Sequence, residues 1–274
     1  MLVVLLGAAL HASWNVLVKS GTDKALDIGL VVAGSALLSL LAVPFVPLPA
    51  SASWPMLAAS GVIHQAYFLL VAAAYRSGDM SLAYPLMRGT PPMLVAVLAS
   101  LLLGETLAPA GWAGVAMVCA GVLATALRHR GAAPSPRTIG FALLNALVIV
   151  AYTLVDGIGA RHSGHAVAYT LWVFLLTAAL LLPFRAWRHG RELARHLRGR
   201  WHVALGGGAC TLGSYALALW AMTQAPIAAV SALRETSILF GVGLAALLLH
   251  ERPGAARLAG VALIAMGAVA LRLG

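Results

Sequence analysis

The sequence predicts an all-α integral membrane protein in which ten transmembrane helices form two inverted five-helix halves. Three observations support this prediction: charged residues are scarce, apolar residues form long runs, and part of the second half repeats part of the first. The composition predicts the membrane, the runs predict the helices, and the repeat predicts how the two halves are arranged.

Charge is too scarce for a soluble protein. Of 274 residues, 61% are hydrophobic and 9% are charged, and the mean hydropathy is +0.93, whereas a soluble domain carries about 25% charged residues. The net charge of +10 does not indicate a nucleic-acid partner, because Lys and Arg lie mainly in loops between apolar runs. Cys119 and Cys210 lie inside apolar runs, so we expect small buried hydrophobic residues there and no disulfide, metal site or cofactor.

Ten apolar runs are each long enough to cross a hydrocarbon core of about 30 Å as a helix. The predicted helices cover residues 1–19, 26–46, 54–76, 80–103, 109–127, 138–158, 165–184, 201–222, 226–249 and 254–272, with turn-forming residues between them. The basic stretch Arg185–Arg200, with Trp187 and Trp201 near its ends, predicts a short interfacial helix on anionic headgroups. The first run is expected to span the membrane and not to be a signal peptide, because it lacks a basic start.

An internal repeat is the most informative feature. A shift of 146 residues places Arg88 on Arg234 and Glu105 on Glu251 without a gap, and Ala113–Ala116 on Ala259–Ala262. Matches between charged residues at one common shift are significant because charged residues are so few. Helices four and five therefore correspond to helices nine and ten, and the chain is predicted to be a duplication of residues 1–130 and 131–274.

Each predicted half contains an odd number of helices, so the second half enters the membrane in the opposite orientation. Inverted repeats of this kind are the usual architecture of secondary transporters, which bind substrate near the bilayer midplane between the repeats. The odd-numbered loops hold 14 of the 18 Lys and Arg residues. The positive-inside rule then places both termini outside.

Three segments resemble a known family. These are LLGAALHASWNVLVKSG, SLAYPLMRGTPPMLVAVLASLLLGETL and APIAAVSALRETSILFGVGLAALLLHERP. Together they resemble the EamA-type transporters of the drug/metabolite transporter superfamily, and the first is particularly similar to a subgroup associated with phosphonate utilisation. The resemblance implies ten helices in two inverted EamA repeats. It also implies gradient-driven export or import of small metabolites across the bacterial inner membrane.

Arg88 and Arg234 are predicted to approach the midplane from opposite faces. An arginine at such depth normally faces a cavity or a charged partner, so each contacts substrate or pairs structurally with a carboxylate. Arginines that line a cavity favour an anionic group such as a carboxylate, phosphate or phosphonate. Glu235 is the best candidate for a protonatable coupling group. Alternatively, it neutralises Arg88 or Arg234 across the interface.

Other polar side chains occur within the apolar runs. We predict that Trp14, Asn15, His64, Tyr67 and Tyr152 contribute to substrate binding together with the two arginines and Glu235, and that His11 and His64 are secondary proton-coupling candidates. Bonds between neighbouring helices are the alternative role of each residue. Gln65, Asn145, Asp156, Ser214 and Tyr215 complete the polar set that a wet central cavity needs.

Prolines, boundary carboxylates and glycines give further expectations. Pro85, Pro91 and Pro92 flank Arg88, and such interruption points to a binding site, whereas the second half has only Pro226 and is expected to differ in stiffness.

Glu105 and Glu251 are expected to mark helix ends, snorkelling or pairing with loop charges. The glycines of the fifth and tenth helices permit close contact between those helices or with a second subunit, so a homodimer is left open; they are Gly114, Gly121, Gly260 and Gly267.

A secondary transporter for a small polar metabolite, amino-acid-like or phosphonate-like, is the function that these features favour. Its expected partners are a small-molecule substrate and the lipid bilayer. The chain contains no G-x-x-x-x-G-K-[ST] loop for ATP hydrolysis and no H-E-x-x-H metal motif, so an intramembrane enzyme is disfavoured. A membrane subunit without transport activity is the remaining alternative, which the inverted repeat disfavours.

Overall fold

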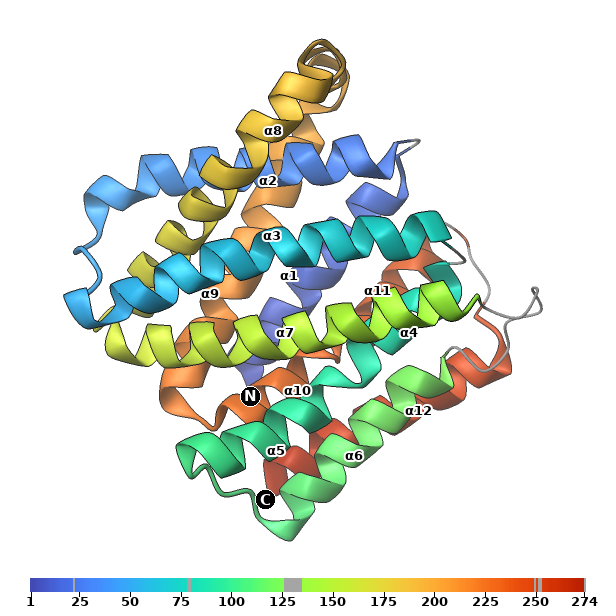
Figure 1. The fold of residues 1–274 in the computed structure, drawn as a ribbon. Coiled ribbons are helices and arrows are strands. Elements are labelled where there is room, and N and C mark those ends of the chain that lie inside the picture. Colours follow the sequence, from blue (N-terminus) through green and yellow to red (C-terminus); the bar gives the residue numbers. More distant parts are fainter. Residues whose placement is uncertain (22, 78–79, 126–134, 249, 251–252, 274) are drawn as a thin grey trace.

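The computed structural model describes residues 1–21, 23–77, 80–125, 135–248, 250 and 253–273. Every regular element in these ranges is a helix, which confirms the all-α prediction (Figure 1). The α-helices are α1 Leu2–Lys19, α2 Lys24–Ala42, α3 Trp54–Ser77, α4 Met80–Gly89, α5 Pro91–Leu103, α6 Pro109–Ala124, α7 Pro136–His162, α8 Ala166–His202, α9 Gly208–Gln224, α10 Ile227–Arg234, α11 Ser237–Leu248 and α12 Ala255–Leu273. Short helical turns cover Val43–Phe45 (η1) and Ser51–Ser53 (η2), and a π-helical turn, η3 Val203–Gly207, joins α8 to α9.

Within these ranges, nine helical stretches are long and apolar enough to cross a membrane, and α6 is a shorter apolar helix. Together they account for the ten predicted spans. Two spans are each made of two helices, α4 with α5 and α10 with α11. The prediction of a ten-helix membrane fold is therefore confirmed, with two interrupted crossings that the predicted ranges 80–103 and 226–249 treated as continuous.

Local sequence chemistry sets several helix ends. The Asp23 carboxylate accepts a hydrogen bond from the Leu26 amide and caps α2, and Ser135 caps α7 in the same way at Thr138. A side-chain acceptor at this position satisfies an amide that has no partner within the helix. At the other end of a span, Gly104 adopts a left-handed conformation (φ 67°) and ends α5, as glycine does most readily.

Helix pairing follows a two-fold pattern. Helix α1 packs against α9, as α3 packs against α7, while α2 packs against α8 and α6 against α12. The predicted duplication makes α1 equivalent to α7 and α9 equivalent to α3, so the first two pairs are equivalent to each other. It also makes α2 equivalent to α8 and α6 equivalent to α12, so each of the last two pairs joins equivalent helices. Figure 1 shows α6 and α12 on the opposite side of the bundle from α2 and α8. Helices of both halves meet in the region between these two sides.

Glycines allow α6 and α12 to cross closely. A methyl group added at Gly121 would lie 2.7 Å from the carbonyl oxygen of Gly260, and one at Gly267 would lie 2.7 Å from that of Gly114. Of the two partners predicted for these glycines, the structure shows the pairing within one chain.

We expect Gly121→Ala to destabilise the fold by about 1–3 kcal/mol, because overpacking a tight contact forces the backbones apart. Thermal unfolding in detergent measures the effect. Gly243→Ala in α11 is the matched control, because nothing lies within 4 Å of a methyl group added there. Equal melting temperatures for the two variants would contradict this assignment.

The predicted interfacial helix is not a separate element. Residues Arg185–Arg200 continue α8, which extends from Ala166 to His202. In Figure 1 the gold end of α8 stands above α2, and the chain returns from there into α9. Trp187 and Trp201 are both exposed, but His196 and Arg200 turn inward to Asp27. One face of this segment therefore packs on the protein, which the sequence pattern did not reveal.

Candidate functional site

Two interrupted helices lie in the centre of the molecule. Helix α4 ends at Gly89 and α5 begins at Pro91, while α10 ends at Arg234 and α11 begins at Ser237. The shift of 146 residues superposes these two interruptions. Interrupted membrane helices in corresponding positions of two halves are the best structural indication of a transporter binding site.

A threonine follows the end of the first helix at each interruption. The Thr90 hydroxyl donates to the Leu86 carbonyl at 3.1 Å, and the Thr236 hydroxyl donates to the Leu233 carbonyl at 2.6 Å. The Leu233 carbonyl also accepts the Thr236 amide at 3.1 Å, so each threonine adds a side-chain bond to the last turn before the interruption. Both helices are interrupted at the same register although prolines flank only the first interruption, and the expected difference in stiffness stays a prediction.

A cavity of about 140 Å³ lies beside the two interruptions. Its wall comes from both halves, and its lining residues on α2, α3 and α9 lie mainly between the middle of each helix and one end of the bundle. That end is where α2 and α9 begin and α3 ends. The cavity is lined by His11, Trp14, Ile28, Val31, Val32, Ser35, His64, Tyr67, Phe68, Val71, Arg88, Tyr152, Val173, Phe174, Thr177, Thr211, Ser214, Tyr215 and Arg234.

Arg88 forms a two-bond ion pair with Glu235 across the two halves. Its Nε donates to one carboxylate oxygen at 3.1 Å, and its Nη2 lies 2.9 Å from the other. Both residues are buried, with exposed fractions of 8% and 5%. The fork geometry is the strongest form of arginine–carboxylate recognition. Arg88 also lines the cavity, so this pair lies in its wall.

Arg234 has a different environment. Its guanidinium carbon lies 5.1 Å from the centre of the Tyr215 ring, which is a cation–π distance, and it lines the cavity. In the described ranges, no carboxylate forms an ion pair with Arg234. The cavity wall therefore presents one arginine neutralised by Glu235 and one arginine whose positive charge is available to a ligand.

Asp156 fixes the ring beneath Arg234. The carboxylate accepts a hydrogen bond from the Tyr215 hydroxyl and another, at 3.0 Å, from the Tyr169 hydroxyl. Asp156 is fully buried and does not line the cavity. Its predicted role as one of several cavity side chains is therefore replaced by that of a support for Tyr215.

We expect Tyr215→Leu to weaken apparent substrate affinity about fivefold or more, because a cation–π contact contributes roughly 1 kcal/mol or more once desolvated. Tyr215→Phe keeps the ring and loses only the bond to Asp156, so its effect should be smaller. The ratio of KM values in a transport assay distinguishes the two. Equal KM values in both variants would mean that the ring does not support Arg234.

Aromatic side chains form much of the remaining wall. His64 stacks on Tyr152 with ring centres 4.8 Å apart, and Tyr67 meets Tyr152 edge-on at 5.9 Å. The Trp14 indole donates to His11 Nδ1 at 3.3 Å, so that nitrogen acts as an acceptor. The wall thus combines apolar area with a few polar atoms, which is the usual composition of a small-molecule site.

Most predicted binding residues meet at the cavity, but two do not face it. The structure brings Arg88, Arg234, Trp14, His64, Tyr67, Tyr152 and His11 to the wall. Glu235 lies behind Arg88. Asn15 is not in the lining, and its amide donates to the His11 carbonyl of its own helix at 2.7 Å. Asn15 therefore does not face this cavity, because the rotation of α1 turns it away, and its contribution to binding stays a prediction.

Two more of the predicted polar residues bind neighbouring helices. The Gln65 amide donates to the Thr177 carbonyl of α8 at 3.2 Å, and the Asn145 amide contacts the Met87 sulfur of α4 at 3.1 Å. Ser214 and Tyr215, in contrast, line the cavity. Glu251 lies outside the described residues, so its expected role at a helix end has no structural counterpart here.

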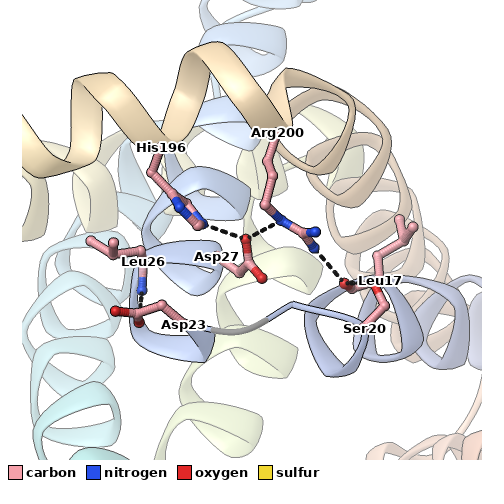
Figure 2. Close-up of polar contacts among 7 residues, drawn as sticks. All are labelled: Leu17, Ser20, Asp23, Leu26, Asp27, His196 and Arg200. Atoms are coloured by element: carbon pink, nitrogen blue, oxygen red, sulfur yellow. Dashed lines mark hydrogen bonds and ion pairs between the residues drawn. The ribbon is translucent and has the colours of Figure 1, made fainter.

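Sequence reasoning missed Asp27. Figure 2 shows its carboxylate between two side chains of α8. His196 Nε2 lies 2.9 Å and Arg200 Nε 2.8 Å from the same carboxylate oxygen, and Asp27 is fully buried. The signal was a carboxylate at the start of an apolar run, but its partners lie more than 160 residues away in the sequence.

The interrupted helices, the paired halves and the central cavity define a multi-pass membrane protein with the architecture of a secondary transporter. The chain belongs to the EamA-like transporter family, whose sequence profile matches residues 1–127 and 136–273. Among solved structures, one described as "Crystal structure of protein" has 19% sequence identity and a TM-score of 0.74, with 99% of this chain and 98% of that chain covered. That similarity shows the shared fold. No curated protein matched the chain.

Proposed function

We propose that the protein is a secondary transporter that carries a small anionic or zwitterionic metabolite, such as an amino acid or a phosphonate, across the bacterial inner membrane. The observation that carries this proposal is the environment of Arg234. It lines a cavity between the two halves, and no carboxylate in the described part of the chain neutralises it. Arg234 is partly buried, and a guanidinium at membrane depth normally faces a cavity or a charged partner, so an anionic substrate would supply the ion-pair partner that it lacks.

Substrate chemistry follows from the groups in the wall. A guanidinium recognises carboxylate and phosphonate oxygens by paired hydrogen bonds. Tyr67, Tyr152 and His64 add polar atoms and flat apolar surface around it. A cavity of about 140 Å³ limits the substrate to a small molecule. The similarity of residues 5–21 to a phosphonate-associated subgroup makes phosphonates the first compounds to test.

Coupling to protons is proposed through Glu235. In its ionised form Glu235 holds Arg88 by two bonds. Protonation removes the charge and frees Arg88, which lines the same cavity as Arg234. Two arginines are then available to one substrate anion, so the proton and the anion enter together. His64 and His11 are secondary coupling candidates because both line the cavity.

Reconstitution into liposomes tests the proposal. Uptake of labelled phosphonates, carboxylates and amino acids is measured with and without an imposed pH gradient. We expect at least one anionic compound to move, and an acidic donor compartment to accelerate it. Glu235→Gln should abolish the response to the pH gradient.

An absence of movement across the whole panel, under every gradient, would favour the alternative of a membrane subunit without transport activity. Movement of neutral or cationic compounds alone would reject the assignment of Arg234 as an anion site. Movement of an anion that ignores the pH gradient would retain transport and remove the coupling role of Glu235.

A further inference from the structure

Carboxylates of the first half are held by basic residues of the second half at both ends of the molecule. At the end where α2 begins, Asp27 is held by His196 and Arg200 of α8 (Figure 2). At the opposite end, Glu105 is held by Arg161 at the end of α7. The positive-inside rule predicts that the end where α2 begins faces the cytoplasm, so we name the first set of contacts the inner latch and the second the outer latch. Arg88 and Glu235 join the halves between them.

We propose that transport through this protein requires the two latches to open in alternation, and that the outer latch acts on the substrate site through α10. This inference rests on the proposed transport function, because the latches matter only if a substrate crosses. The contacts that form the latches are different from those that carry the proposed function. None of the latch residues lines the cavity.

The inner latch connects three elements. Besides binding Asp27, Arg200 donates from Nη2 to the Leu17 carbonyl of α1 at 3.1 Å. The second oxygen of Asp27 has no hydrogen-bond partner in the described ranges although it is fully buried. A buried carboxylate with an unsatisfied oxygen is costly, so this arrangement is suited to breaking when the neighbouring helices separate.

An apolar layer lies between the inner latch and the cavity. Val18, Val31 and Val203 pack together with Trp14 and Ile28, and three of these five residues also line the cavity. Asp27 immediately precedes Ile28 on α2. Opening the inner latch therefore separates α8 from α1 and α2, and η3, which directly follows α8, packs with α1 and α2 to close this end of the cavity.

The outer latch holds α10 by its first turn. The Glu105 carboxylate accepts the Ile227 amide at 3.1 Å and the Ala228 amide at 3.5 Å. It also accepts Arg161 Nη2 at 2.6 Å, and Arg161 donates from Nε to the Met222 carbonyl at 2.8 Å. A carboxylate at a helix N-terminus is favoured by the helix dipole. Glu105 is therefore a cap for α10 and an ion-pair partner, which goes beyond the expected marker of a helix end.

Helix α10 is short and links this latch to the substrate site. It extends only from Ile227 to Arg234, so the capped end and the cavity arginine are about 10 Å apart at the helical rise. The chain is interrupted directly after Arg234, which lets α10 move without α11. Release of Glu105 would thus shift Arg234, linking outward opening to release of a bound anion.

The test measures access to the cavity and not transport. Ser214 lines the cavity, so a Ser214→Cys reporter is placed in a background with Cys119→Ala and Cys210→Ser. Its reaction with a membrane-impermeant thiol reagent is measured from each face of the membrane. Glu105→Gln should accelerate the reaction from the outer face at least about fivefold and slow it from the inner face, while Asp27→Asn should do the reverse.

Asp23→Asn is the matched control. Asp23 lies one turn from Asp27, carries the same charge and caps α2 without touching the second half (Figure 2), and asparagine caps equally well. This variant should react as the unmodified reporter does. Size-exclusion profiles and melting temperatures identify variants that fail to fold, and Glu105→Asp then replaces Glu105→Gln, because the shorter carboxylate keeps the charge and reaches fewer partners.

Folded latch variants that leave both reaction rates unchanged, or shift both in the same direction, would overturn the inference. Uptake of the panel compounds by the same proteins separates it from the function proposal. Opposite shifts in access without uptake of any compound would keep the latches and reject transport. Normal uptake with unaltered access would keep transport and reject the latches.

Discussion

Arg234→Ala is expected to raise the KM for an anionic substrate by about 30-fold or more. Losing one partner of a desolvated, hydrogen-bonded charge pair costs about 2 kcal/mol at the lower end of measured values, and every 1.4 kcal/mol corresponds to a factor of ten. The protein should still fold, because Arg234 contacts the Tyr215 ring and forms no ion pair with a carboxylate in the described ranges. Initial uptake rates over a range of substrate concentrations measure the effect.

Arg234→Lys is the informative comparison. It keeps the charge and loses the planar fork, so we expect partial rescue of affinity for a carboxylate or phosphonate. If Arg234→Ala transports with an unchanged KM, the anion site is elsewhere in the cavity. If alanine and lysine are equally defective, geometry matters more than charge at this position.

Arg88→Ala should lower the free energy of unfolding by about 3–5 kcal/mol, because it leaves the Glu235 carboxylate buried without a partner. Both side chains are nearly inaccessible, so water cannot substitute for the guanidinium. Thermal or denaturant-induced unfolding in detergent measures the loss. This is the largest stability effect that we expect from a single polar substitution in the chain.

The double variant Arg88→Ala/Glu235→Gln is the control for this prediction. It removes the unpaired charge, so it should recover much of the lost stability, and the difference from the sum of the single effects gives the coupling energy of the pair. Additive effects of the two substitutions would show that the pair contributes little. The variant should also lose the response of uptake to a pH gradient.

The pair of Arg88 with Glu235 explains why corresponding arginines have different roles. The repeat places both at the same register beside matching interruptions. The second half carries Glu235 where the first half carries Gly89, and this carboxylate binds the arginine of the other half. One asymmetric position thus converts a symmetric pair of arginines into one neutralised and one available charge. Arg234 is then the cation that is available to an anionic substrate. Glu235 is the proposed proton-coupling group, and its protonation would release Arg88.

The sequence by itself determined the membrane environment, the ten spans, the family and the equivalence of Arg88 with Arg234. The family depends on the resemblance of three segments, and the other features depend on composition, run length and a shift along the chain, all of which are one-dimensional. It also identified most of the polar residues that line the cavity, because polar side chains in apolar helices are conspicuous. It did not reveal that Asn15 lies outside the cavity lining, because the rotation of α1 about its axis depends on the helices that surround it.

Only the tertiary structure decided which charges are paired. Arg88 and Glu235 are 147 residues apart, and Asp27 lies 169 and 173 residues from His196 and Arg200. Partner choice over such separations depends on how two oppositely oriented halves interlock, and no local pattern encodes that register. For the same physical reason the interruption between α10 and α11 was missed. No proline marks it, and it forms where Arg234 and Glu235 turn towards partners on other helices.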